Sequence, residues 1–131
     1  MAGGVRTLLR IEGACVLAVS LLAYRSHGAG WTAFAIAFLA PDLSFLGYLA
    51  GPRVGALLYN AAHAYVGPLA CLAAGALWGG SGWPWLTAAG LIWSAHIGLD
   101  RALGFGLKYG IGFKATHLGV LGRRPPDPDG R

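Results

Sequence analysis

The chain has 131 residues, of which 56% are hydrophobic and only 11% are charged, and its formal net charge at pH 7 is +5. Soluble domains have roughly 25% charged residues, so this composition excludes an ordinary soluble globule, a disordered chain and, with two cysteines, a disulfide scaffold. A single small multi-pass membrane domain remains.

The excess of basic residues raises the question of a nucleic-acid partner. The ten Lys and Arg residues lie mainly between or outside the apolar stretches of the chain. They do not form the clustered, aromatic-interleaved basic patch that grips a nucleic acid backbone. We therefore expect no nucleic-acid partner.

Four apolar stretches near the length of a membrane-spanning helix follow one another along the chain. They cover about residues 5–24, 31–50, 53–78 and 83–106. Because the connections are short, consecutive helices should be antiparallel neighbours. The sequence predicts an all-α, integral-membrane four-helix up-down bundle in one domain, residues 1–122, followed by a solvated Pro/Asp/Arg-rich tail, residues 123–131.

The orientation follows from the basic residues. With the N-terminus inside, nine of the ten Lys and Arg residues, all but Arg25, fall at the cytoplasmic ends or in the tail, as the positive-inside rule requires. We expect a multi-pass protein of the inner (plasma) membrane with both termini in the cytoplasm. A cleavable signal peptide is the alternative for the first stretch, but Glu12 within the apolar run disfavours it.

Polar residues interrupt every stretch at a similar depth. They are, in chain order, Glu12, Asp42, Asn60, His63, His96 and Asp100. At about 1.5 Å per helical residue, all six lie about 9–15 Å from the predicted cytoplasmic end of their spans. A charged, unpaired carboxylate costs up to about 3 kcal/mol inside a membrane, so we expect one polar layer, drawn from all four helices, in which these groups compensate one another.

The spacing within this layer favours a metal site. His96 and Asp100 are four residues apart, so they share a helix face and are able to bind one ion. Pro41 frees backbone carbonyls beside Asp42 in mid-span, which is tolerated next to a water-accessible cavity. Nitrogen and oxygen ligands of this kind suit a divalent Zn, Mn or Fe ion.

Roles follow from these chemistries. We predict that His63, His96 and Asp100 are metal ligands, that Asp42 is a ligand or general base, and that Glu12 transfers protons or supports the ligands. Two alternatives stay open: the same groups form a proton or ion path, or they are hydrogen bonds that hold the helices together.

The end of the fourth stretch and the region after it add further candidates. Arg101 and Lys108 are suited to hold an anionic or phosphorylated group, and Asn60, in the third stretch, is another substrate-binding candidate. His117 is positioned to close the polar layer as another acid/base group. A solvated interfacial segment is the alternative interpretation.

Several short polar motifs resemble a known family. They are Arg10-Ile-Glu12-Gly, Ala40-Pro-Asp42-Leu-Ser44, Tyr59-Asn60-Ala-Ala-His63, His96-Ile-Gly-Leu-Asp100-Arg101, Gly106-Leu-Lys108-Tyr and Thr116-His117-Leu-Gly119. With them the chain resembles the small bacterial membrane family called domain of unknown function 4260, over about residues 8–122. The resemblance implies a four-helix integral membrane protein and no particular activity.

A fainter similarity links Pro41-Asp42 and Thr116-His117 to membrane-bound metal-dependent hydrolases, which use Pro-Asp-Xaa-Asp and Thr-His-Ser patterns. The chain departs from these patterns at Ser44 and Leu118.

The sequence thus favours metal-dependent hydrolysis of a lipid-soluble or phosphorylated substrate within the bilayer. A proton-coupled or ion-conducting transporter and an accessory subunit of a larger membrane complex are the alternatives, and a homodimer is a further possible assembly.

Overall fold

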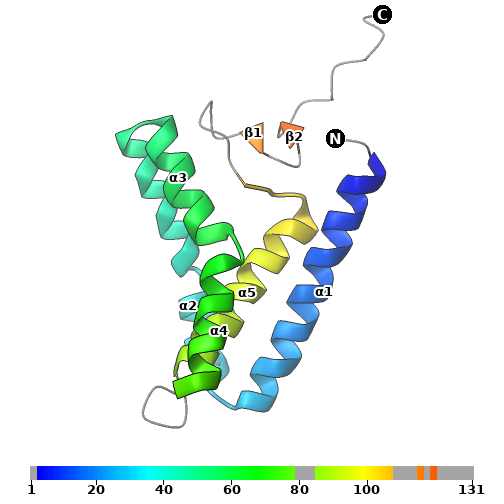
Figure 1. Ribbon diagram of the computed structural model, residues 1–131, viewed down its shortest axis with the longest axis vertical. Coiled ribbons are helices and arrows are strands. Elements are labelled where there is room, and N and C mark those ends of the chain that lie inside the picture. The colour runs from blue at the N-terminus through cyan, green and yellow to red at the C-terminus, as the bar shows by residue number, and fades with distance from the viewer. Residues whose placement is uncertain (1–2, 79–84, 108–114, 117–118, 121–131) are drawn as a thin grey trace, which may run out of the picture.

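The computed structural model describes residues 3–78, 85–107, 115–116 and 119–120. Its helices are α1 (Gly3–His27), α2 (Trp31–Phe38), the 3-10 helix η1 (Ala40–Ala50), α3 (Pro52–His63), α4 (Val66–Trp78) and α5 (Trp85–Leu103). Taking α2 with η1 and α3 with α4, these elements fill the four predicted spans. Figure 1 shows that they alternate in direction, so that α1 begins and α5 ends at the same end of the molecule.

Two short strands lie outside the helices. β1 (Ala115–Thr116) pairs antiparallel with β2 (Gly119–Val120), with Ala115 opposite Val120 and Thr116 opposite Gly119. Within the described residues, the regular structure is therefore helical apart from this four-residue ladder.

Three helical segments of the described chain are long and apolar enough to cross a membrane, namely Gly3–His27, Trp31–Ala50 and Pro52–Trp78. The fourth segment, α5, is not one of them, because it carries several polar side chains. It packs against α1, α2 and α4, which lets it bury these side chains between its neighbours. Polar residues in membrane proteins take such interior positions, and the apolar outer helices indicate a membrane protein.

Helices α1 and α5 cross in backbone contact at Gly13 and Gly98. A Cβ added to Gly13 would lie 2.8 Å from the carbonyl oxygen of Gly98 and 2.4 Å from the Cβ of Arg101. Small residues allow membrane helices this close approach. The crossing fixes the position of α5, which carries two of the predicted metal ligands.

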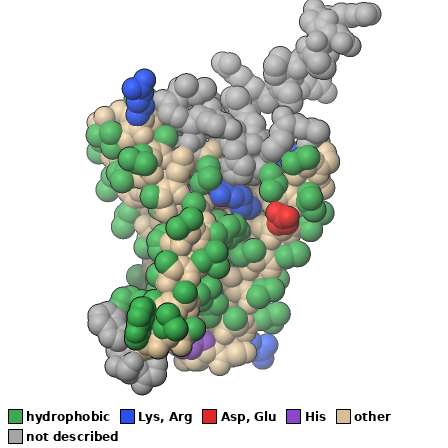
Figure 2. Space-filling model, in the orientation of Figure 1, with side chains coloured by type: hydrophobic (Ala, Val, Ile, Leu, Met, Phe, Trp, Pro, Cys, Tyr) green, Lys and Arg blue, Asp and Glu red, His purple; other side chains and the backbone are tan. Residues whose placement is uncertain are grey.

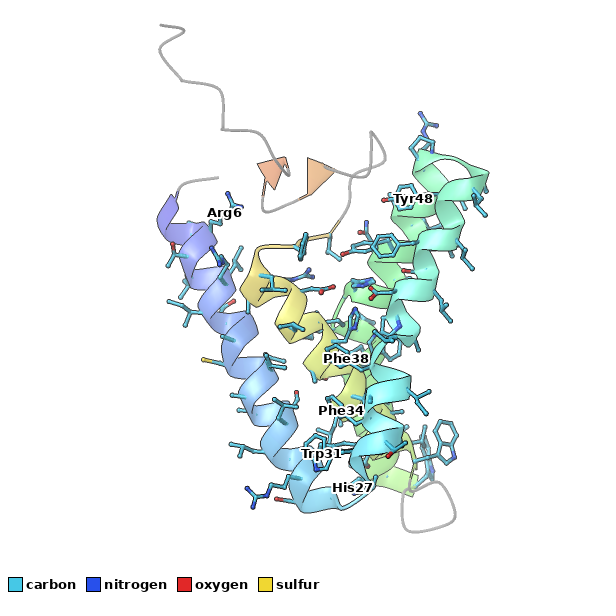
Figure 3. The ribbon with its side chains drawn as sticks, turned by 180° about the vertical axis from the view of Figure 1, so that it is seen from behind. Arg6, His27, Trp31, Phe34, Phe38 and Tyr48 are labelled. Carbon is cyan, nitrogen blue, oxygen red and sulfur yellow. The ribbon has the colours of Figure 1, made fainter. Side chains whose placement is uncertain are left out.

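Aromatic side chains fill the end of the bundle where α1 turns into α2. Tyr24 contacts Trp31 and Phe34, and Phe34 stacks on Phe38 with ring centroids 5.5 Å apart. Figure 3 shows Trp31, Phe34 and Phe38 following one another along α2. The turn itself uses Gly28, whose φ of 77° suits glycine, and it is tied by the Tyr24 hydroxyl, which donates to the carbonyl of Gly30.

The second and third spans are both broken in the middle, whereas the sequence predicted continuous helices. α2 ends at Phe38, and the chain continues through Leu39 into η1, an 11-residue 3-10 helix that begins beside Pro41. α3 ends at His63, and the extended backbone of Ala64 separates it from α4. Beyond these breaks, η1 and α3 pack on each other and lean away from α1 (Figure 1).

Candidate metal centre

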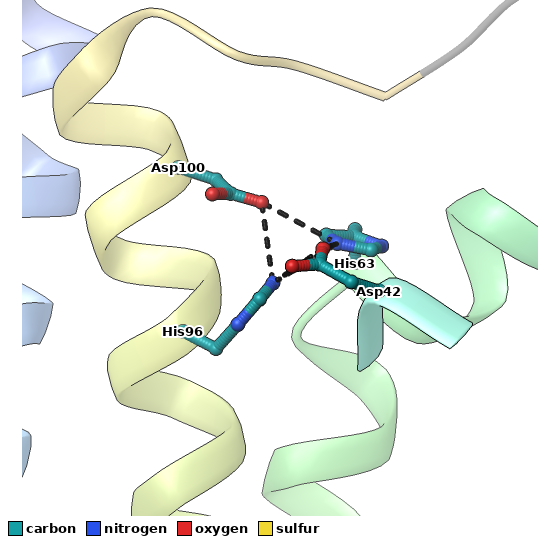
Figure 4. A group of neighbouring side chains, drawn as sticks. All are labelled: Asp42, His63, His96 and Asp100. Carbon is teal, nitrogen blue, oxygen red and sulfur yellow. Dashed lines mark hydrogen bonds and ion pairs between the residues drawn. The ribbon is translucent and has the colours of Figure 1, made fainter. Parts of the chain in front are cut away.

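Four side chains from three spans meet at the level of the two breaks. Asp42 lies in the first turn of η1, His63 is the last residue of α3, and His96 and Asp100 lie one helical turn apart on α5. One ligand atom of each lies within 4.8 Å of all the others. Figure 4 shows the four side chains pointing toward a common centre.

Five of the six separations within this cluster suit four ligands around one metal ion. The Nε2 atoms of His63 and His96 are 3.2 Å apart, and each lies 3.2–3.4 Å from Oδ1 of Asp42 and Oδ2 of Asp100. The corners of a regular tetrahedron with such edges lie about 2.0–2.1 Å from its centre, which is the length of Zn–N and Zn–O bonds. The two carboxylate oxygens lie within 4.8 Å of each other.

Backbone carbonyls set the tautomer of both histidines. Nδ1 of His63 lies 2.9 Å from the carbonyl oxygen of Tyr59, and Nδ1 of His96 lies 2.6 Å from that of Phe38. A carbonyl only accepts hydrogen bonds, so both Nδ1 atoms carry hydrogen and donate. In the neutral imidazoles both Nε2 lone pairs then face the centre, as metal-binding histidines require.

In this geometry, lone pairs of all four side chains face the centre of the cluster. Two ionised carboxylates and two unprotonated Nε2 atoms are all acceptors. Placing such groups 3.2–3.4 Å apart is unfavourable unless a cation lies among them. Either a metal ion or additional protons must supply that positive charge.

Side chains of α5 also satisfy the main chain at the two helix breaks. His96 donates a hydrogen bond to the carbonyl of Phe38, the last residue of α2. The Nη2 atom of Arg101 donates to the carbonyl of His63, the last residue of α3, at 2.9 Å. A cation is favourable at a helix C-terminus. Arg101, predicted as a substrate-binding group, is 7% exposed and holds the backbone of a ligand residue.

Aromatic rings restrict the movement of both imidazoles. The ring of Tyr59 stacks on that of His63 with centroids 3.9 Å apart and planes 9° apart, and Phe38 packs against His96 at 4.9 Å. Trp93 donates from Nε1 to the carbonyl of Ala62 at 2.5 Å, which ties α5 to the end of α3. These contacts hold the ligands in place in the absence of any ion.

The four ligands differ in exposure. The side chains of His63 and His96 are 0% and 3% exposed, that of Asp100 is 19% exposed, and that of Asp42 is 43% exposed. The cluster is therefore closed by α5 and α3 and open on the side of η1.

The remaining predicted residues lie elsewhere. Glu12 is exposed on α1, where it lines a cavity together with Arg101, so the cluster draws on three spans and not on four as predicted. Asn60 is half-buried on α3, one turn before His63. Lys108 and His117 lie outside the described residues, and their predicted roles stay predictions.

Sequence reasoning missed the residues that support the ligands. Tyr59 lies four residues before His63, so the sequence alone placed the two on one helix face. The hydrogen bond from His96 to the carbonyl of Phe38 joins residues 58 positions apart, so no local sequence pattern predicted it.

The family model described as domain of unknown function DUF4260 matches residues 6–121, nearly the whole chain, and the chain belongs to this family. No curated protein and no solved structure matches it significantly.

Proposed function

We propose that this DUF4260 member is a zinc-dependent hydrolase embedded in the membrane. The observation that carries the proposal is the convergence of two Nε2 atoms and two carboxylate oxygens at 3.2–3.4 Å between helices of a membrane protein. Nitrogen and oxygen ligands in a tetrahedral arrangement favour Zn over Mn, which prefers octahedral oxygen ligands, and over Fe.

His63, His96 and Asp100 are the three permanent ligands in this proposal, because they are the most buried members of the cluster. Two histidines and one carboxylate are a known ligand set of catalytic zinc sites, which keep a fourth position for water. Asp42 lies beside that fourth position and is not counted as a permanent ligand. It is the most exposed of the four, so a water molecule reaches the centre on its side.

Asp42 acts as the general base in this scheme. A zinc ion held by His63, His96 and Asp100 would supply a water of lowered pKa, about 7. The Asp42 carboxylate would hold the proton that such a water gives up. His63 and His96 keep their Nδ1 protons on backbone carbonyls throughout, which holds Nε2 toward the centre.

The substrate class follows from the surroundings. Apolar helices enclose the site, so a lipid-soluble substrate reaches it from the bilayer, and Lys108 is assigned to an anionic or phosphorylated group of that substrate. The distribution of Lys and Arg supports a plasma-membrane protein with both termini in the cytoplasm and the site in the inner half of the bilayer.

A cation carrier is the second candidate. The breaks between α2 and η1 and between α3 and α4 lie at the level of the cluster. Discontinuous helices of this kind surround the ion sites of many secondary transporters. In that case the bound ion is cargo, and Asp42 is the ligand that admits it.

Metal content tests the shared premise of both candidates. We expect the purified full-length protein to retain one zinc ion per chain by elemental analysis, and His63→Ala and His96→Ala to lose it. His27→Ala is the matched control, since His27 is exposed at the far end of α1. Absence of metal from the wild-type protein would refute the proposal.

Two activity measurements then separate the candidates. A hydrolase cleaves phosphate or carboxylate esters of long-chain alcohols in mixed micelles, and it does so only when zinc is bound. A carrier moves zinc into proteoliposomes and leaves the esters intact. Zinc flux without ester cleavage would replace the hydrolase by the carrier.

A further inference from the structure

Two adjoining cavities lie on the face of the molecule between α1 and α4, away from the four metal-site ligands. They share Cys15, Val16 and Tyr65, and their volumes are about 440 and 460 Å³. Each falls within the range of about 300–1,000 Å³ that is usual for ligand pockets. Because they share three lining residues, we treat them as one continuous groove, here called the α1 groove.

The α1 groove is polar at one end only. Glu12 and Arg101 line the cavity near the start of α1. The other cavity is lined mainly by apolar residues such as Val19, Leu69 and Leu72, and none of its described lining residues is charged. Figure 2 shows this face, where basic and acidic side chains lie within an otherwise largely apolar surface.

Cations outnumber acids at the polar end. Besides Arg101, the Arg10 side chain reaches across to α5 and donates from Nε to the carbonyl of Ala102 at 2.9 Å. The guanidinium of Arg6 lies close to Gly104, just beyond α5. Arg101 lines the cavity with Glu12, while Arg10 and Arg6 reach the nearby end of α5 without lining it. Three guanidinium groups and the one carboxylate of Glu12 therefore lie at this end of α1 and α5, a balance that favours an anionic group.

The length of the groove matches one leaflet. Its lining runs from Leu9 to Ser20 on α1, which spans about 16 Å at about 1.5 Å per residue. Half of the hydrocarbon core of a bilayer is about 15 Å thick. One acyl chain parallel to α1 would therefore fill the groove from its charged end to its apolar end.

We infer that the α1 groove binds a single-chain lipid with a phosphate headgroup. Its acyl chain lies along Val16, Val19 and Leu69, and its phosphate lies beside Arg101 and Arg10. The Glu12 carboxylate at the same end weakens the attraction and thereby limits the affinity. None of the four metal-site ligands lines the groove, although Arg101 contacts both sites, and lipid binding does not require zinc.

Native mass spectrometry of the full-length protein, delipidated and released from detergent micelles, tests the inference. The probe is palmitoyl lysophosphatidate, and neutral palmitoyl glycerol is the comparison. Val19→Trp places a large ring in the groove. Leu22→Trp is its matched control on the same helix, since Val19 is 66% and Leu22 64% exposed, but Leu22 lines neither cavity.

We expect one lysophosphatidate per wild-type chain, bound at least about tenfold more tightly than palmitoyl glycerol, and about tenfold weaker binding to Val19→Trp but not to Leu22→Trp. Arg10→Gln should weaken binding about threefold, and Glu12→Gln should strengthen it about threefold. Arg25→Gln, at the far end of α1, should change nothing.

Equal binding to both tryptophan variants would overturn the inference, because it would mean annular lipid only. Equal binding of the neutral probe would overturn the assignment of a phosphate. A dimer that Val19→Trp dissociates, with no bound lipid, would assign the groove to a second copy. Zinc content measured on the same samples keeps this test distinct, since loss of lipid binding with zinc retained affects only the α1 groove.

Discussion

The Nε2 atoms of His63 and His96 lie 3.2 Å apart, and each imidazole gives its Nδ1 proton to a backbone carbonyl. While both rings are neutral, neither Nε2 has a hydrogen to share with the other. A cation between the two Nε2 atoms removes the repulsion of their lone pairs. The nearby carboxylates of Asp42 and Asp100 favour a divalent ion.

Replacement of the two carboxylates should separate metal binding from catalysis. We expect Asp100→Asn to lose more than about 100-fold in zinc affinity, because it removes a buried ligand, whereas loss of a group that only supports a ligand costs about 10- to 100-fold. Asp42→Asn should keep zinc and lose hydrolytic turnover by about 100-fold or more, because it removes the general base. Zinc titration and initial rates on the same preparations measure both effects. Undiminished turnover of Asp42→Asn would remove Asp42 from its assigned role.

Zinc affinity should fall with decreasing pH. Only a neutral imidazole offers its Nε2 lone pair, so protons compete with the ion for His63 and His96. Affinity is then highest where both imidazoles are neutral and falls as the pH is lowered through their titration. Competition with a zinc indicator at a series of pH values provides the measurement. The exposed His27→Ala variant should follow the wild-type curve, and a flat profile would contradict histidine ligation.

Arg101→Gln should weaken both the fold and the zinc site. It removes a charge-assisted hydrogen bond to the carbonyl of His63, worth about 1.5–3 kcal/mol. We expect lower thermal stability in detergent and weaker zinc binding, because the end of α3 is no longer held. Arg10→Gln is a fitting control, since Arg10 also donates to a backbone carbonyl but is exposed. Equal effects of the two substitutions would argue against the assigned role of Arg101.

Gly13→Ala should destabilise the contact between α1 and α5. The added methyl group would lie 2.4 Å from the Cβ of Arg101 and 2.8 Å from the carbonyl oxygen of Gly98, so the helices must separate. Overpacking of this kind costs about 1–3 kcal/mol. The midpoint of thermal unfolding reports the change. Gly4→Ala is the control, because nothing lies within 4 Å of its added Cβ, and a Gly13→Ala variant as stable as this control would refute the close contact.

Much of the centre was predictable from hydropathy and spacing. Apolar runs located the spans, and the common depth of Asp42, His63, His96 and Asp100 placed them in one layer. Depth follows from the helical rise alone. The rotation of a helix about its axis does not, because it depends on which face packs against a neighbour.

Glu12 illustrates this limit. It has the same predicted depth as the ligands, but the contact of Gly13 with α5 determines which way α1 faces, and Glu12 then lines the α1 groove instead of the metal centre. Pro41 predicted free carbonyls in the second span, but the break after His63 and the partners of both sets of carbonyls escaped prediction for a related reason. These carbonyls are stable only because α5, a later part of the chain, supplies donors to both.

That dependence on α5 bears on how the protein is made. The ribosome releases the chain from its N-terminus, so the interrupted second and third spans leave it before α5 does. Unpaired carbonyls are costly in hydrocarbon. The carbonyls of Phe38 and His63 gain these partners only when α5 joins the earlier spans, and α5 also brings two of the four metal-site side chains.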